Sequence, residues 1–118
     1  MGFAGALGTI SRYLLGGWIY TWLGSEFPYG TLIVNVSGSL AIGFLGTLAD
    51  ERFLLGSQVR LTILLGFLGA FTTFSSFTYE TWNLLKDGEI FLAGCNLFGS
   101  LLACFIGLAV GIFAARLL

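Results

Sequence analysis

The chain has 118 residues, of which 57% are hydrophobic and 9% are charged, and its formal net charge is −1. A soluble domain carries roughly 25% charged residues, so this composition argues against a soluble all-helical core. The chain contains no histidine, which excludes a histidine base or a histidine metal ligand. Its length predicts a single domain over residues 1–118.

The charges are confined to short stretches of the sequence. Residues 27–49, 61–79 and 90–115 carry none, and residues 2–24 carry only Arg12. A helix of about 20 apolar residues crosses a bilayer. The pattern therefore predicts an all-α integral membrane protein with four transmembrane helices, over about residues 1–23, 29–49, 61–84 and 90–115.

The first segment has "GALGTISRYLLGG" at its centre. Its glycines permit close approach of a neighbouring helix. Arg12 is the exception, because a charge inside a span is costly and usually faces a cavity, a partner or the interface. Two interpretations stay open: Arg12 extends to the interface or orients a helix end, or it contributes positive potential to an anion path.

The second segment follows Pro28, a residue that suits a helix start. Thr31, Asn35 and Ser39 recur every four residues and share one helix face. An asparagine in a span most often joins helices by hydrogen bonds. The competing interpretation is that the Asn35 amide lines a path.

The third segment contains "GFLGAFTTFSSF", in which phenylalanines alternate with hydroxyl residues after two glycines. We expect the helix to break near Gly69–Thr73, although an intact helix whose hydroxyls bond to their own turn is the alternative. A break at membrane depth is tolerated where it is buried or lines a cavity, and its free carbonyls are natural cation ligands. Glu80 follows near a membrane edge, in a vestibule or at the interface.

The fourth segment repeats the polar pattern of the second. Asn96, Ser100 and Cys104 lie on one face, and Gly107 and Gly111 form a GxxxG step that predicts a packing face. Cys95 and Cys104 fall about 13.5 Å apart along the helix axis, so they cannot form a disulfide with each other. We interpret both cysteines as small packing residues.

The two polar faces together suit an anion that needs hydrogen bonds. Asn35, Ser39, Asn96 and Ser100 offer amide or hydroxyl groups, and no carboxylate lies in the middle of a span. The edge of a phenyl ring is electropositive and can contact a small anion without holding it as strongly as an ammonium group does. Conduction needs such weak binding, so the pattern predicts an anion path.

The distribution of basic residues gives little preference for one orientation in the membrane. With four spans both termini lie on one side, together with Arg52, Arg60 and Arg116, while Lys86 lies on the other. This bias weakly favours cytoplasmic termini. We therefore expect that the chain can insert in both orientations.

The sequence resembles a known family, the small bacterial fluoride channels of the Fluc or CrcB type. The motifs that carry the resemblance are "GALGTISRY", "GTLIVNVSGS" and "GFLGAFTTFSSF" with "TYE" after it. The resemblance covers nearly all of the chain. It implies a fluoride-selective ion channel of the bacterial plasma membrane, not an enzyme, that exports cytoplasmic fluoride by passive electrodiffusion and so reduces fluoride toxicity.

The resemblance also implies an assembly. Members of the family form antiparallel, dual-topology dimers in membrane lipid, with two pores and no nucleic-acid partner. We expect a homodimer, with a heterodimer of two homologous chains as the alternative. One structural Na⁺ would lie at the dimer interface, held by the backbone carbonyls of Gly69 and Thr72.

The site residues implied by the resemblance fall into two groups. Asn35, Phe74 and Phe77 would line the pore, Ser76 would offer its hydroxyl to the ion, and Ser100 and Asn96 would continue the polar path. Arg12 and Glu80 would lie in or near a vestibule. The polar stripe here departs from the tyrosine-and-hydroxyl pattern of some members at Asn96 and Cys104.

Two other functions compete with the channel interpretation. A small multidrug transporter needs an acidic residue within the first helix, where this chain has Arg12 and no acid before Glu26. A non-transporting assembly subunit would use its polar stripes only to hold helices together. Ion flux through the purified protein separates this second alternative from a channel.

Overall fold

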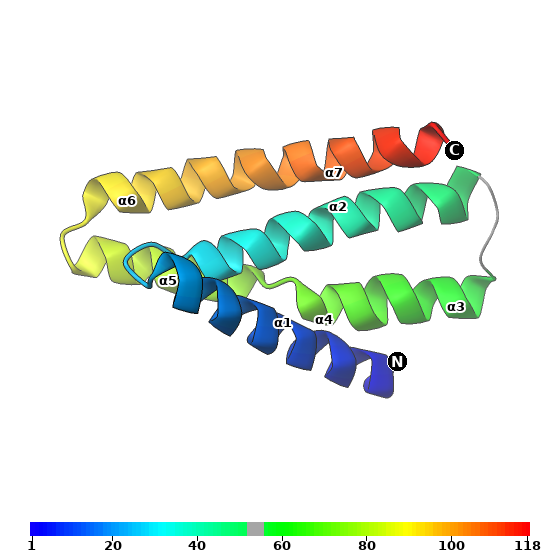
Figure 1. Ribbon diagram of the computed structural model, residues 1–118, viewed down its shortest axis with the longest axis horizontal. Helices are drawn as coiled ribbons and strands as arrows, with labels where there is room; N and C mark the ends of the chain where they lie inside the picture. Colours follow the sequence, from blue (N-terminus) through cyan, green and yellow to red (C-terminus); the bar gives the residue numbers. More distant parts are fainter. Residues whose placement is uncertain (52–55) are drawn as a thin grey trace.

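The computed structural model describes residues 1–51 and 56–118, and within these ranges the chain folds into helices without strands. This confirms the all-α prediction. The elements, shown in Figure 1, are α1 (Gly2–Leu23), α2 (Tyr29–Glu51), α3 (Ser57–Leu61), the π-helical stretch η1 (Thr62–Leu68), α4 (Gly69–Phe71), α5 (Phe74–Lys86), α6 (Ile90–Gly94), the π-helical stretch η2 (Cys95–Gly99) and α7 (Ser100–Arg116).

The helices run along the long axis of an elongated molecule whose Cα extents are 48 × 29 × 22 Å. Both termini lie toward the same end of this axis (Figure 1). Ion pairs at that end join Asp50 to Arg60 and Glu51 to Arg116. Arg52, one of the basic residues expected on the side of the termini, lies outside the described residues.

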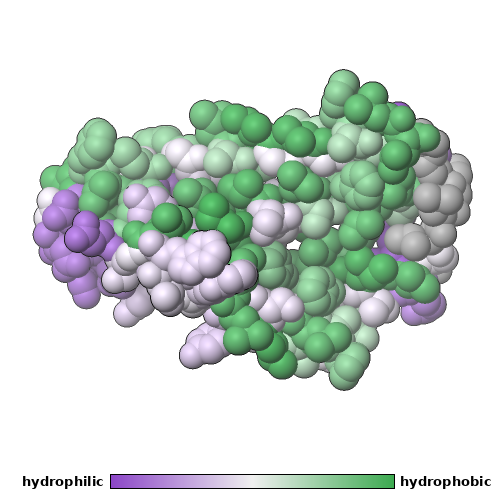
Figure 2. Space-filling view, in the orientation of Figure 1, coloured by the Kyte–Doolittle hydropathy of each residue, from purple (hydrophilic) through white to green (hydrophobic). Residues whose placement is uncertain are grey.

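Three helical stretches of the described chain are long and apolar enough to cross a membrane: Tyr29–Glu51, Gln58–Lys86 and Ile90–Arg116. Helix α1 has 22 residues but is not among them, and Arg12 lies at its centre. Hydrophobic residues cover much of the visible face, and hydrophilic residues gather at its left end (Figure 2). The crossing of the membrane by α1 therefore stays a prediction.

Helices α2 and α7 form the most extensive helix pair of the fold. Their backbones approach closely at glycines, as the GxxxG step predicted. A Cβ atom on Gly111 would collide with the carbonyl of Leu40, and one on Gly43 would collide with the carbonyl of Leu108. This pair forms the wall on which the second and fourth polar faces lie.

Helix α1 packs against the first half of the third segment. A Cβ atom on Gly8 would collide with the carbonyl of Phe67, and one on Gly66 would lie 3.1 Å from the Cβ of Ala4. This close contact places α1 beside η1 and α4. Arg12 is thereby brought next to the end of α4.

The third segment is broken, as predicted, and the break falls at Thr72 and Thr73. Both residues are extended, with φ −81° and ψ 156° at Thr72 and φ −148° and ψ 119° at Thr73. Thr73 caps the new helix, because its hydroxyl accepts a hydrogen bond of 3.2 Å from the Ser76 amide. The π-helical stretch η1, which ends just before α4, was not predicted.

Candidate functional site

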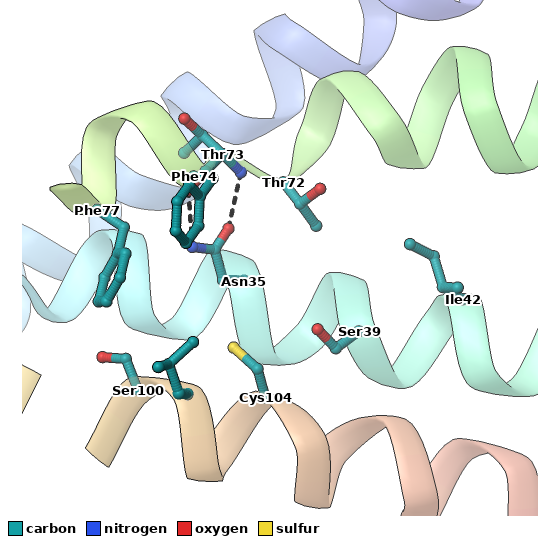
Figure 3. Close-up of a pocket in the computed structure, with 10 residues that line it drawn as sticks. Asn35, Ser39, Ile42, Thr72, Thr73, Phe74, Phe77, Ser100 and Cys104 are labelled. Atoms are coloured by element: carbon teal, nitrogen blue, oxygen red, sulfur yellow. Dashed lines mark hydrogen bonds between the residues drawn. The ribbon is translucent and has the colours of Figure 1, made fainter. Parts of the chain in front are cut away.

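Asn35 binds the broken backbone directly. Its Nδ2 donates to the carbonyl of Thr73 over 2.9 Å, and its Oδ1 accepts from the Thr73 amide over 2.8 Å (Figure 3). The asparagine thus satisfies two backbone groups that the break deprives of helical partners. The interpretation that Asn35 joins helical segments by hydrogen bonds is confirmed. Asn35 also lines a cavity, and a path through it stays a prediction.

The break frees two particular carbonyls. In a continuous helix Gly69 O would accept from the Thr73 amide, and Thr72 O would accept from the Ser76 amide. The Thr73 amide instead donates to Asn35, and the Ser76 amide donates to the hydroxyl of Thr73. Backbone oxygens without helical donors suit a hard cation such as Na⁺. The described residues contain no cluster of three or more His, Cys, Asp or Glu side chains that could hold a metal.

A cavity of about 230 Å³ lies beside the break, between α2, α5 and α7. Figure 3 shows Asn35 next to the phenylalanines, with Ser100 and Cys104 facing them from α7. The polar lining of the cavity comes from α2, α7 and the break, while two rings of α5 form the aromatic part. The polar lining residues are Asn35, Ser39, Thr72, Thr73, Ser100 and Cys104, and the rings are Phe74 and Phe77.

The two rings of this cavity differ in their surroundings. Phe77 is 4% exposed, whereas Phe74, in the first turn of α5, is 68% exposed. Their centroids lie 5.4 Å apart with the planes inclined at 43°. Phe77 is therefore fixed inside the fold, and Phe74 presents its ring at the surface of the molecule.

The polar face of the fourth segment divides between the cavity and the interior. Ser100 and Cys104 line the cavity, whereas Asn96 is not among its lining residues and is 2% exposed. Asn96 Nδ2 donates to Thr81 Oγ1 over 2.7 Å, and Ser100 Oγ donates to Asn96 Oδ1 over 3.0 Å. Asn96 thus lies behind Ser100 and joins it to α5.

A second cavity, of about 560 Å³, lies on the α1 side of the break. It brings together Arg12, Ser76 and Glu80, three residues for which the family resemblance implies a place in a vestibule or in the path. Thr73 lines this cavity as well as the first one. The two cavities therefore adjoin at the extended backbone of the break.

The charged groups of the second cavity are held by polar neighbours. Arg12 Nε donates to the carbonyl of Ala70 over 3.3 Å, at the end of α4, where a cation is favoured by the helix dipole. Thr31 Oγ1 donates to Glu80 Oε1 over 2.8 Å. Within the described chain, Glu80 Oε2 is buried without a hydrogen-bond partner. Arg12 therefore stabilises the break besides adding positive charge to the cavity.

Three threonines of the site were not singled out from the sequence for these roles. Thr73 caps α5 and binds Asn35, Thr31 binds Glu80, and Thr81 binds Asn96. A threonine just ahead of a helix is a known cap signal, which identifies Thr73 in principle. The partners of Thr31 and Thr81 depend on which helices become neighbours, and a single-segment pattern does not contain that information.

Comparison with known proteins gives a consistent result. A family model described as "CrcB-like protein, Camphor Resistance (CrcB)" matches residues 1–112. A Geobacter sulfurreducens protein named "Fluoride-specific ion channel FluC" is 48% identical over 95% of this chain and 90% of its own length. A protein of the same name from Geotalea daltonii is 45% identical over 98% of this chain and 94% of its own length. Another from Opitutus terrae is 47% identical over 94% of this chain and 86% of its own length.

Proposed function

The chain belongs to the CrcB-like protein family, and we propose that it is a fluoride-selective channel that exports cytoplasmic fluoride by passive electrodiffusion. The observation that carries this proposal is the similarity, 48% and 45% identity over 95% and 98% of the chain, to relatives named as fluoride-specific channels. The family is one of ion channels rather than enzymes. By analogy with the bacterial relatives, the proposed location is the bacterial plasma membrane, where export would reduce fluoride toxicity.

In this proposal the cavity beside the break is part of the fluoride path. Asn35 has two amide hydrogens and gives one to Thr73, so the other is available to an anion. The edges of Phe74 and Phe77 add weak electropositive contacts. A path built from neutral donors and ring edges binds fluoride weakly enough to release it.

The second cavity is proposed as the vestibule of that path. Arg12 and Glu80 lie in it with Ser76, and Thr73 connects it to the cavity that contains Asn35. Arg12 would raise the local concentration of anions. Ser76 would offer its hydroxyl to an ion on the vestibule side of the break.

The proposed assembly is an antiparallel, dual-topology homodimer in membrane lipid, with two pores. The exposed ring of Phe74, at the edge of the path, supports a second protomer as its cover. A heterodimer with a homologous chain is the alternative assembly. The carbonyls of Gly69 and Thr72 from both protomers would hold one Na⁺, which supplies a fixed positive charge between two breaks.

The proposal is tested by ion efflux from liposomes that contain the purified protein. Fluoride and chloride electrodes record both ions side by side in sodium buffer, with protein-free liposomes as the control. Rapid fluoride loss without chloride loss is the expected result. Loss of neither ion from a correctly folded, dimeric protein would contradict the channel and favour the assembly subunit.

A further inference from the structure

A buried chain of hydrogen bonds links the wall of the first cavity to its aromatic side. Ser100 Oγ donates to Asn96 Oδ1 over 3.0 Å, and Asn96 Nδ2 donates to Thr81 Oγ1 over 2.7 Å. Thr81 Oγ1 in turn donates to the carbonyl of Phe77 over 2.8 Å. All four residues are 9% exposed or less.

The donors and acceptors in this chain of hydrogen bonds follow a fixed direction, because its last acceptor is a carbonyl. A carbonyl only accepts, so the single proton of the Thr81 hydroxyl is given to Phe77. The Thr81 oxygen must then accept from the amide nitrogen of Asn96. This turns the amide oxygen of Asn96 toward Ser100, which must donate its own single proton to it.

The direction of these hydrogen bonds determines which part of the Ser100 hydroxyl faces the cavity. Ser100 lines the cavity together with Asn35 and Phe77, but its proton is directed away from it toward Asn96. The Ser100 hydroxyl therefore turns the lone pairs of its oxygen toward the cavity. Fluoride accepts hydrogen bonds and does not donate them, so Ser100 in this orientation offers it no hydrogen bond.

We propose that Asn96 is a positioning residue that holds the Ser100 proton away from the fluoride path and thereby weakens fluoride binding at this point. The inference rests on the proposed function and replaces direct ion contact by Asn96 with an indirect role. If Ser100 turned its proton to the ion, Asn96 Oδ1 would be left as a buried acceptor without a partner, which is unfavourable. Asn96 and the ion therefore compete for one proton, and the competition favours release over retention.

The test compares the half-saturating fluoride concentration and the maximal flux of three variants with those of the parent protein. Ser100→Ala is expected to change the half-saturating concentration by less than about threefold, because the lost proton did not serve the ion. Asn96→Leu frees that proton and is expected to lower the half-saturating concentration by about fivefold, while maximal flux falls. Combining the two substitutions should abolish the effect of Asn96→Leu.

Thr81→Val is the matched structural control. It removes the bonds of Thr81 to Phe77 and Asn96 but retains the Asn96 amide, whose oxygen can still accept from Ser100. We expect lower thermal stability with a half-saturating concentration within about twofold of the parent value. If these hydrogen bonds had a purely structural role, Thr81→Val and Asn96→Leu would show the same flux phenotype. That result would contradict the inference.

The outcomes separate this inference from the proposed function. A parent protein without fluoride flux contradicts the channel and the inference with it. A conducting parent in which Ser100→Ala weakens fluoride binding more than about tenfold overturns the inference alone, because Ser100 then donates to the ion. This second result is decisive even if Asn96→Leu does not fold.

Discussion

Asn35 and Thr73 exchange two hydrogen bonds, of 2.9 Å from Asn35 Nδ2 to Thr73 O and 2.8 Å from Thr73 N to Asn35 Oδ1. A side chain of α2 thus replaces two of the helical partners that the third segment loses at its break. The same amide lines the cavity between α2, α5 and α7. The geometry of the break and the chemistry of the cavity therefore depend on one side chain.

Asn35→Asp is expected to abolish fluoride flux. The aspartate cannot donate to Thr73 O, and its charge repels an anion at the wall of the cavity. The unpaired backbone carbonyl would cost about 1–3 kcal/mol of stability. Fluoride efflux from liposomes and thermal unfolding in detergent measure the two effects.

Ser37→Ala is the control for this substitution on the same helix. Ser37 is exposed, and its hydroxyl donates only to the carbonyl of Val34 in its own helix. We expect its flux and stability to match those of the parent. Fluoride flux in Asn35→Asp equal to that in Ser37→Ala would remove Asn35 from the proposed path.

Replacing either ring of the aromatic pair by isoleucine should reduce flux, but only one of the two substitutions should reduce stability. Phe74→Ile and Phe77→Ile should each reduce fluoride flux by more than tenfold, because isoleucine has no electropositive ring edge. Phe77→Ile should also lower stability by about 1–3 kcal/mol, since that ring is 4% exposed, whereas Phe74 is 68% exposed. Liposome efflux measures flux, thermal unfolding measures stability, and gel filtration checks that both variants keep the same dimer fraction. Normal flux in both variants would exclude the ring-edge contact.

The fold was predictable from the sequence to the extent that hydropathy and glycine spacing determine it. The charge-free segments identified the helical stretches, and the glycines before Thr72 and Thr73 indicated the break. The GxxxG step at Gly107 and Gly111 identified a packing face of α7. Each of these signals is contained within a single segment.

The site was less predictable, because its contacts join different segments. Helical spacing placed Asn96 and Ser100 on one face, but only the packing of α5 against the fourth segment shows that Thr81 holds Asn96 away from the cavity. The π-helical stretch η2 shifts the register of this face, and such an insertion has no simple sequence pattern. Ser76 likewise shares a helix with Phe77 but lines the other cavity.

Removal of sodium tests the proposed ion at the break. Protein purified and reconstituted with N-methylglucamine in place of Na⁺ should lose at least tenfold in fluoride flux and recover it when Na⁺ is restored. Thr72→Val serves as the control, because the proposed ligand is the Thr72 carbonyl and the hydroxyl donates to Leu68. We expect the variant to keep the sodium dependence. Equal flux with and without sodium in the parent would contradict the site.

Two glycines of α2 give a matched pair of substitutions. A Cβ atom on Gly38 would collide with Cγ2 of Thr72 and lie 3.3 Å from the ring of Phe71, so it would press on the break itself. A Cβ atom on Gly46 would meet no atom within 4 Å. The same change, glycine to alanine, therefore acts on the break in one position and on helix propensity alone in the other.

Gly38→Ala is expected to reduce fluoride flux by more than tenfold and to cost about 1–3 kcal/mol, because Thr72 must move and with it the carbonyl proposed to bind sodium. Gly46→Ala should leave flux unchanged and raise stability by up to about 1 kcal/mol, since alanine favours the helix. Liposome efflux and thermal unfolding of both variants provide the comparison. Because the two substitutions add the same methyl group to the same helix, equal flux in the pair would show that conduction does not depend on the position of Thr72.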